Sequence, residues 1–92
     1  MDLLIRKEAA QEISQAHAWY EQRREGLGER FMLEAEHRFD QINRHPTLFP
    51  TVYQMIRKAP LRAFPYGIYY LAAGNQIIVL RVLHHRQRHP TW

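Results

Sequence analysis

The sequence contains no cysteine, which excludes disulfide bonds, thiolate catalysis and zinc sites built from thiolates. It also lacks long hydrophobic runs. The longest, such as IIVL at 77–80, is far shorter than a membrane span, and the opening residues MDLLIRKEAA lack the pattern of a secretory leader. We therefore expect a protein without a membrane segment that resides in the reducing cytoplasm. With 92 residues, we expect a single domain over residues 1–92.

Acidic residues are absent from the second half of the chain. All nine Asp and Glu residues lie within residues 1–40, where six Lys and Arg residues leave a net charge of −3. Residues 41–92 contain seven Lys and Arg residues and no acid, a net charge of +7. A concentration of uncompensated cations favours an anionic partner, either a phosphate backbone or an acidic polypeptide.

The first half predicts a strand followed by a helical hairpin. The apolar residues at 3–5 suit a short strand, and from Lys7 onward apolar residues recur at helical spacing. The stretch GLGE at 26–29 breaks this pattern, and a second helix is predicted from about Glu29 to Arg44. The predicted buried positions are Ala9, Ile13, Ala16 and Tyr20 in the first helix and Phe31, Ala35, Phe39 and Ile42 in the second.

The second half predicts three strands. HPTLFP at 45–50 ends the second helix, because each proline disfavours helical geometry in the residue before it. Segments 55–61, 65–73 and 76–84 are rich in Ile, Val, Leu and Tyr, and Gly74-Asn75 is a two-residue hairpin turn. The predicted fold class is α+β with the order β-αα-βββ, in which the helical hairpin covers one face of a small, mostly antiparallel sheet.

Several features of this order have a familiar spacing. They are Ala9-Ala10 with Trp19-Tyr20 on an early helix, the break at Gly26–Gly28, the proline-bounded loop at 45–50, the motif R-x-FPY-x-I-Y-Y from Arg62, and the ending V-L-H-x-R-x-x-x-P-x-W from Val82. With these features the chain resembles, over essentially its whole length, the RelE/ParE superfamily of type II toxins, often labelled plasmid stabilisation proteins.

The resemblance implies a small toxin that needs no cofactor and is neutralised by a cognate antitoxin. RelE-like members cut messenger RNA on the ribosome, whereas ParE-like members bind and block DNA gyrase. Our leading interpretation is a ParE-like toxin acting on gyrase without enzymatic chemistry. The alternatives are a ribosome-dependent, metal-independent RNA endonuclease and a degenerate member that binds only its antitoxin.

The basic half supplies the candidate site residues. Metal-free RNA cleavage needs proton-transfer groups, for which His84 and His85 are the candidates if the protein is a nuclease. Binding of a phosphate or of the target is assigned to Arg57, Lys58, Arg62, Arg81 and Arg86.

Two features weaken the nuclease interpretation. RelE-like nucleases tend to carry alternating basic residues on one strand face, whereas Arg57 and Lys58 are adjacent, which places them on opposite faces. Those nucleases also commonly have a catalytic tyrosine near the C-terminus, and this chain has none after Tyr70.

Strict alternation along the last strand predicts two faces. One carries Ile77, Val79, Arg81 and Leu83, and the other carries Ile78, Leu80, Val82 and His84. Arg81 is then either a residue whose stem packs while its head reaches solvent, or a cation for a phosphate or a partner carboxylate. His85 and His89 have the four-residue spacing of helical zinc ligands, but Pro90 opposes a helix there and no third ligand is near, so no metal site is expected.

Overall fold

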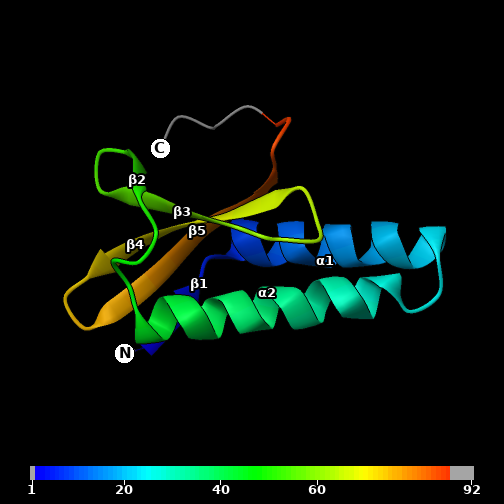
Figure 1. Ribbon diagram of the computed structural model, residues 1–92, viewed down its shortest axis with the longest axis horizontal. Coiled ribbons are helices and arrows are strands. Elements are labelled where there is room, and N and C mark those ends of the chain that lie inside the picture. Colours follow the sequence, from blue (N-terminus) through cyan, green and yellow to red (C-terminus); the bar gives the residue numbers. More distant parts are fainter. Residues whose placement is uncertain (1, 88–92) are drawn as a thin grey trace.

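The computed structural model describes residues 2–87 (Figure 1). The elements are β1 (Asp2–Ile5), α1 (Lys7–Arg23), α2 (Leu27–Arg44), β2 (Thr51–Tyr53), β3 (Ile56–Pro60), β4 (Tyr66–Ala73) and β5 (Gln76–His84). The predicted α+β order is confirmed, with β2 as an additional strand. All three residues of β2 are exposed, so they carry none of the apolar alternation that marks a half-buried strand.

The five strands form one mixed sheet in the order β1-β5-β4-β3-β2. β1 runs parallel to β5, and the other neighbouring pairs are antiparallel. The turn at Gly74-Asn75 joins β4 to β5 as predicted, and Gly74 has the positive φ of 59° that a tight hairpin turn requires. In this order, β1 and β2 are the two edge strands of the sheet.

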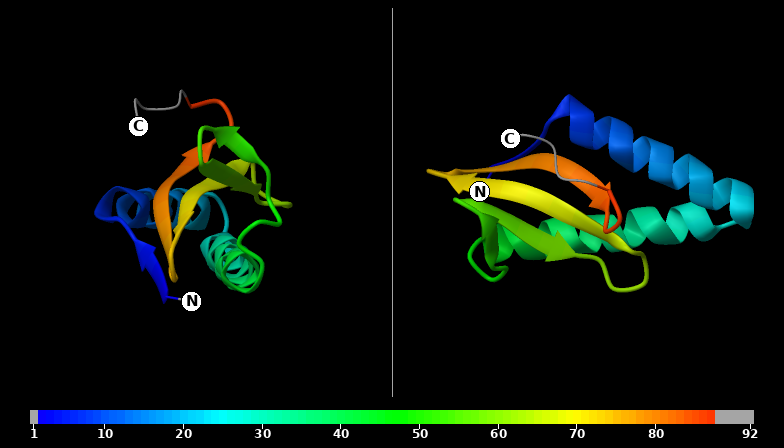
Figure 2. Two further views of the ribbon diagram at one scale, coloured as in Figure 1. Left: turned by 90° about the vertical axis from the view of Figure 1, so that its left-hand side faces the viewer. Right: turned by 90° about the horizontal axis from the view of Figure 1, so that it is seen from above.

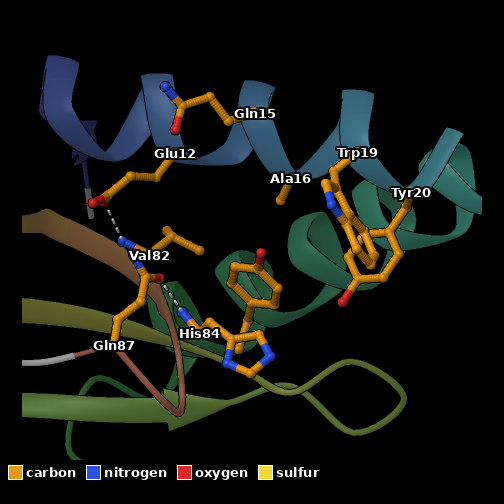
Figure 3. A pocket seen from close by; sticks show the side chains of 9 residues that line it. Glu12, Gln15, Ala16, Trp19, Tyr20, Val82, His84 and Gln87 are labelled. Atoms are coloured by element: carbon orange, nitrogen blue, oxygen red, sulfur yellow. Dashed lines mark hydrogen bonds between the residues drawn. The ribbon is translucent and has the colours of Figure 1, made fainter. Parts of the chain in front are cut away.

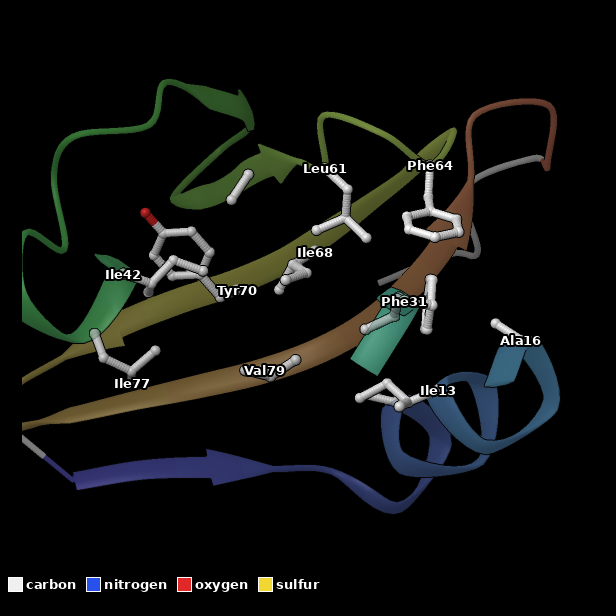
Figure 4. Packing of buried hydrophobic residues seen from close by; sticks show 13 residues of the cluster. Ile13, Ala16, Phe31, Ile42, Leu61, Phe64, Ile68, Tyr70, Ile77 and Val79 are labelled. Atoms are coloured by element: carbon white, nitrogen blue, oxygen red, sulfur yellow. The ribbon is translucent and has the colours of Figure 1, made fainter. Parts of the chain in front are cut away.

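The helical hairpin packs on one face of the sheet, and its turn projects beyond the strands (Figures 1 and 2). The main core lies between the two layers, and Figure 4 shows 13 of its residues. The helices contribute Ala9, Ile13, Ala16, Phe31 and Ile42, and the sheet and its loops contribute Ala59, Leu61, Phe64, Ile68, Tyr70, Ile77, Val79 and Val82. The predicted helix faces are thus confirmed, with Tyr20 and Phe39 partly buried against this core.

Glu21 fixes the turn between the helices. Its carboxylate accepts hydrogen bonds from the backbone N–H groups of Gly26 and Gly28, each at 2.9 Å. Gly26 has a φ of 85°, and α2 starts at Leu27, two residues earlier than the sequence pattern predicts. The bonds to the carboxylate satisfy two donors at a helix end that otherwise lack partners. A Cβ on Gly28 would lie 2.6 Å from the His17 carbonyl oxygen, so glycine permits the close approach of the helices.

The last strand, β5, contains a β-bulge, so the predicted division of its residues between two faces is wrong beyond that point. Tyr69 pairs with Arg81, but Tyr70 pairs with Val79, which leaves Leu80 as an extra residue. Alternation is broken at this point. Val82 therefore joins the main core with Ile77 and Val79, whereas Leu80 and Leu83 face the other side of the sheet.

The face of the sheet away from the helices carries a second, smaller apolar cluster. Ile56, Tyr69, Leu80 and Leu83 are buried there, and Leu71 and Ile78 pack against them. We call this face the outer face.

Candidate functional site

A pocket of about 360 Å³ lies between α1 and the end of β5. Figure 3 shows that its side chains come from both layers. It is lined by Glu12, Gln15, Ala16, Trp19, Tyr20, Tyr66, Val82, His84 and Gln87. The pocket therefore combines aromatic walls with amide, imidazole and phenol groups at one end of the sheet.

Glu12 closes one side of the pocket and holds the two layers together. Its carboxylate accepts hydrogen bonds from Arg81 Nε at 2.8 Å, from Arg81 Nη2 and from the backbone N–H of Val82 at 2.9 Å. The side chains of Glu12 and Arg81 are 15% and 29% exposed. The hydrogen bond that Arg81 donates to Glu12 raises the pKa of Arg81 above its usual value. The two opposite charges thus neutralise each other in a partly buried position.

The aromatic wall is built around Tyr66. Its ring lies 6.2 Å from that of Tyr20 and 5.3 Å from the imidazole of His84, both in edge-to-face arrangements. Burial raises the pKa of both tyrosines above the usual value, so their phenols stay protonated at neutral pH. The wall can pack against an apolar or aromatic group, and neutral phenols are poor proton acceptors.

Trp19 stands at the rim, with 50% of its surface exposed. The Arg23 guanidinium carbon lies 4.2 Å from the centre of its ring, within the range of a cation–π contact. Exposed tryptophan and arginine are the residue types that most often anchor protein interfaces.

His84 and His85 do not form a joint acid–base site. His84 lines the pocket on the helix side, where its Nδ1 accepts a hydrogen bond from the Arg86 backbone N–H at 3.1 Å. His85 instead lines a different cavity, together with Lys58. Desolvation of its ring, with the nearby charges of Lys58 and His84, lowers the pKa of His85 and so favours the neutral imidazole.

The predicted cations are spread over the molecule rather than gathered at one point. Arg81 is bound to Glu12, and Arg57 donates to the carbonyl oxygen of Phe49 at 2.6 Å. The Lys58 ammonium lies 5.6 Å from the centre of the Tyr69 ring on the outer face. Arg57 and Lys58 therefore do point to opposite faces, as their adjacency predicts.

The remaining two predicted cations are exposed. Arg62 lies in the loop before β4, where its backbone N–H and that of Ala63 bind the carboxylate of Glu34. The side chains of Arg62 and Arg86 form no ion pair within residues 2–87. Both are free to meet an external anion.

Residues 2–87 contain no group of three or more His, Asp or Glu side chains placed to hold a metal ion. His89, the second residue of the zinc-like spacing, lies outside these described residues. None of the described helices is long and apolar enough to cross a membrane.

The sequence of residues 3–89 matches the family described as the ParE toxin of the type II toxin–antitoxin system parDE. The chain belongs to the ParE toxin family. Among solved structures, one from the chromosomal ParDE toxin–antitoxin system of P. aeruginosa has a similar fold, with a TM-score of 0.66 and 17% sequence identity. The match covers 89% of this chain and 92% of that one. A search of curated proteins found no match.

In this ParE-family chain, the predicted site residues did not include two helical carboxylates, of which Glu12 binds β5 and Glu34 binds the loop before β4. Glu12 follows Ala9 by three residues and precedes Ala16 by four, which places it beside the buried stripe of α1. An acid at such a position signals a bonded partner. Glu34 shows the same signal, because it follows buried Phe31 by three residues, but neither position reveals which backbone N–H groups the carboxylate binds.

Proposed function

We propose that this chain is the toxin of a type II toxin–antitoxin pair, that it inhibits DNA gyrase by binding, and that a cognate antitoxin neutralises it. The match to the ParE toxin family over residues 3–89 carries the proposal. The geometry supports binding rather than catalysis, because the groups available for acid–base chemistry are separated.

The separation of His84 from His85 is the main structural support. A cleavage reaction needs a proton acceptor, a proton donor and cations around one scissile phosphate. Here the two histidines line different cavities, and the guanidinium of Arg81 is already neutralised by Glu12. A partner-binding surface requires none of these groups to converge.

The surface near β2 also fits a protein partner. Leu48, Val52, Tyr53 and Met55 are between 48% and 69% exposed. Residues 41–87 carry six Lys and Arg residues and no acid. Clustered exposed apolar residues within a cationic surface are typical of a site for an acidic, amphipathic segment, which is the character we expect of the antitoxin.

A gyrase supercoiling assay with purified toxin tests the target. We expect loss of supercoiling or accumulation of cleaved DNA at toxin concentrations that arrest growth, and recovery when the antitoxin is added. Normal supercoiling with no cleaved DNA at those concentrations would contradict the proposal.

A translation extract provides the second readout. We expect intact messenger RNA in the presence of the toxin. Cuts within codons that disappear in the His84→Ala or His85→Ala variant would instead establish the endonuclease alternative. Expression without the antitoxin separates both from a degenerate member, for which growth would continue.

A further inference from the structure

Lys58 is held in a defined position on the outer face of the sheet. Its side chain crosses the neighbouring strand at Gly67, where a Cβ would lie 2.6 Å from Lys58 Cε and 3.2 Å from Lys58 Cγ. The ammonium then lies over the ring of Tyr69, which is 2% exposed. A glycine within a strand often marks a close approach, and here it makes room for a lysine stem.

The lysine forms one wall of a cavity of about 490 Å³ at the β2 edge of the sheet. The other lining residues are Phe49, Pro50, Val52, Pro60 and His85. Four of these five are apolar, so the cavity presents a mostly apolar surface with nitrogen groups from Lys58 and His85. A ligand that fits has an anionic group joined to an apolar one.

The charge of Lys58 has no carboxylate partner among residues 2–87. This distinguishes Lys58 from Arg81 and Arg44, each of which is paired with an acid on a helix. A cation next to apolar walls gains more from an incoming carboxylate than a fully hydrated cation does, because the local dielectric constant is lower. A nucleic acid backbone suits the cavity less well, since it brings a row of phosphates that require several cations.

The edge position of β2 favours an extended ligand. The Lys58 N–H donates to the Pro50 carbonyl and Thr51 is paired with Arg57, so the backbone N–H and C=O of Thr51 point away from β3. β2 spans only Thr51–Tyr53 and lies at the end of the sheet (Figure 1). A short stretch of extended peptide can therefore follow this edge while its side chains enter the cavity.

We infer that this cavity binds an acidic, extended segment of a partner protein, with a carboxylate on the Lys58 ammonium and a neighbouring apolar side chain between Val52 and Pro60. Gly67 is a positioning residue for Lys58. The identity of the segment rests on the proposed function, under which it belongs to the antitoxin. Binding of an acidic peptide to the cavity can be tested without knowing whether the natural segment belongs to an antitoxin.

The probe is an acetylated, amidated eight-residue peptide of alternating valine and glutamate, titrated into ¹⁵N-labelled full-length protein and followed by NMR. We expect chemical-shift changes centred on Val52, Lys58 and His85. The Lys58→Gln variant should weaken binding at least about fivefold, whereas Arg30→Gln, which removes an equal charge from an exposed position on α2, should leave it within about twofold. A peptide of alternating valine and glutamine should bind more weakly than the acidic peptide.

The Gly67→Ala variant separates positioning from charge. It keeps Lys58 but displaces its stem, so we expect weaker peptide binding at unchanged net charge, with folding checked by urea denaturation. Equal effects of Lys58→Gln and Arg30→Gln, shift changes centred on the pocket of Trp19 and His84, or tighter binding of a thymidine oligonucleotide at the same residues would each overturn the inference. A negative gyrase assay would overturn the proposed function but would leave the peptide result standing.

Discussion

Replacing Glu12 by alanine should destabilise the fold far more than removing an exposed helical acid such as Asp40. The carboxylate binds two nitrogen atoms of Arg81 and the backbone N–H of Val82, whose residue is 1% exposed. An orphaned buried N–H costs about 1–3 kcal/mol, and a hydrogen bond to a charged group contributes about 1.5–3 kcal/mol. Because the Arg81 side chain is 29% exposed and regains some water, we expect a total loss of about 3 kcal/mol in the free energy of unfolding.

The assay is urea unfolding followed by circular dichroism and tryptophan fluorescence. For a domain of this size, about 3 kcal/mol corresponds to a Tm about 12–24 °C lower. Asp40→Ala is the matched control, since it also removes one helical acid but breaks an exposed i,i+4 pair with Arg44 that contributes only about 0.3–0.5 kcal/mol. Glu12→Gln keeps an acceptor for the Val82 N–H and should fall between the two.

A double-mutant cycle with Arg81→Ala completes the test. Residues that share an ion pair and hydrogen bonds show coupling energies of about 0.5–3 kcal/mol, and we expect about 1 kcal/mol or more for Glu12 and Arg81. A Glu12→Ala variant within about 0.5 kcal/mol of Asp40→Ala, or a coupling energy near zero, would refute the claim that this contact joins the helix layer to the sheet.

Three further predictions concern the hairpin turn and the core. Hydrogen bonds from the backbone N–H groups of Gly26 and Gly28 lower the pKa of Glu21 below its usual value, so its contribution to stability is present above the unfolded-state pKa and is lost as the pH falls through the folded-state pKa; Glu21→Gln should flatten this acid limb in pH-dependent unfolding. Gly28→Ala should cost about 1–3 kcal/mol, measured by urea unfolding, because the new Cβ meets the His17 carbonyl oxygen; an unchanged midpoint would contradict this close approach. Tyr70→Phe removes a 2.7 Å hydrogen bond to the Pro46 carbonyl and should lower the free energy of unfolding by about 0.5–1.5 kcal/mol; a Tm unchanged in thermal denaturation would refute this.

Most of the fold could be predicted from the sequence because its signals are local. Helical spacing placed Ala9, Ile13 and Ala16 in the core, and Gly74 marked the hairpin turn. β2 could not be predicted because its three residues are exposed, and the start of α2 was displaced because Glu21 supplies the cap from the preceding helix. In both cases the structure of the segment depends on contacts with another part of the chain: β2 pairs with β3, and the start of α2 is capped by Glu21.

The candidate site was less predictable because it depends on pairing between distant residues. Glu12 and Arg81 are 69 residues apart, so neither spacing nor composition reveals their contact. The extra residue Leu80 has no sequence signature that strict alternation detects, and it altered the predicted face of His84. The sequence shows directly that the second half is basic. It does not show which of the cations form ion pairs and which do not.

The bulge at Leu80 has a consequence for comparing this chain with its relatives. It shifts the phase of every side chain that follows it, so His84 faces α1 while His85 lines the cavity with Lys58. In a relative whose last strand lacks one residue, the histidine aligned with His84 would occupy the opposite surface and meet a different partner. Structurally equivalent residues at the end of β5 are therefore found by counting paired residues of β4 and β5 from the hairpin at Gly74. A sequence alignment alone does not identify them.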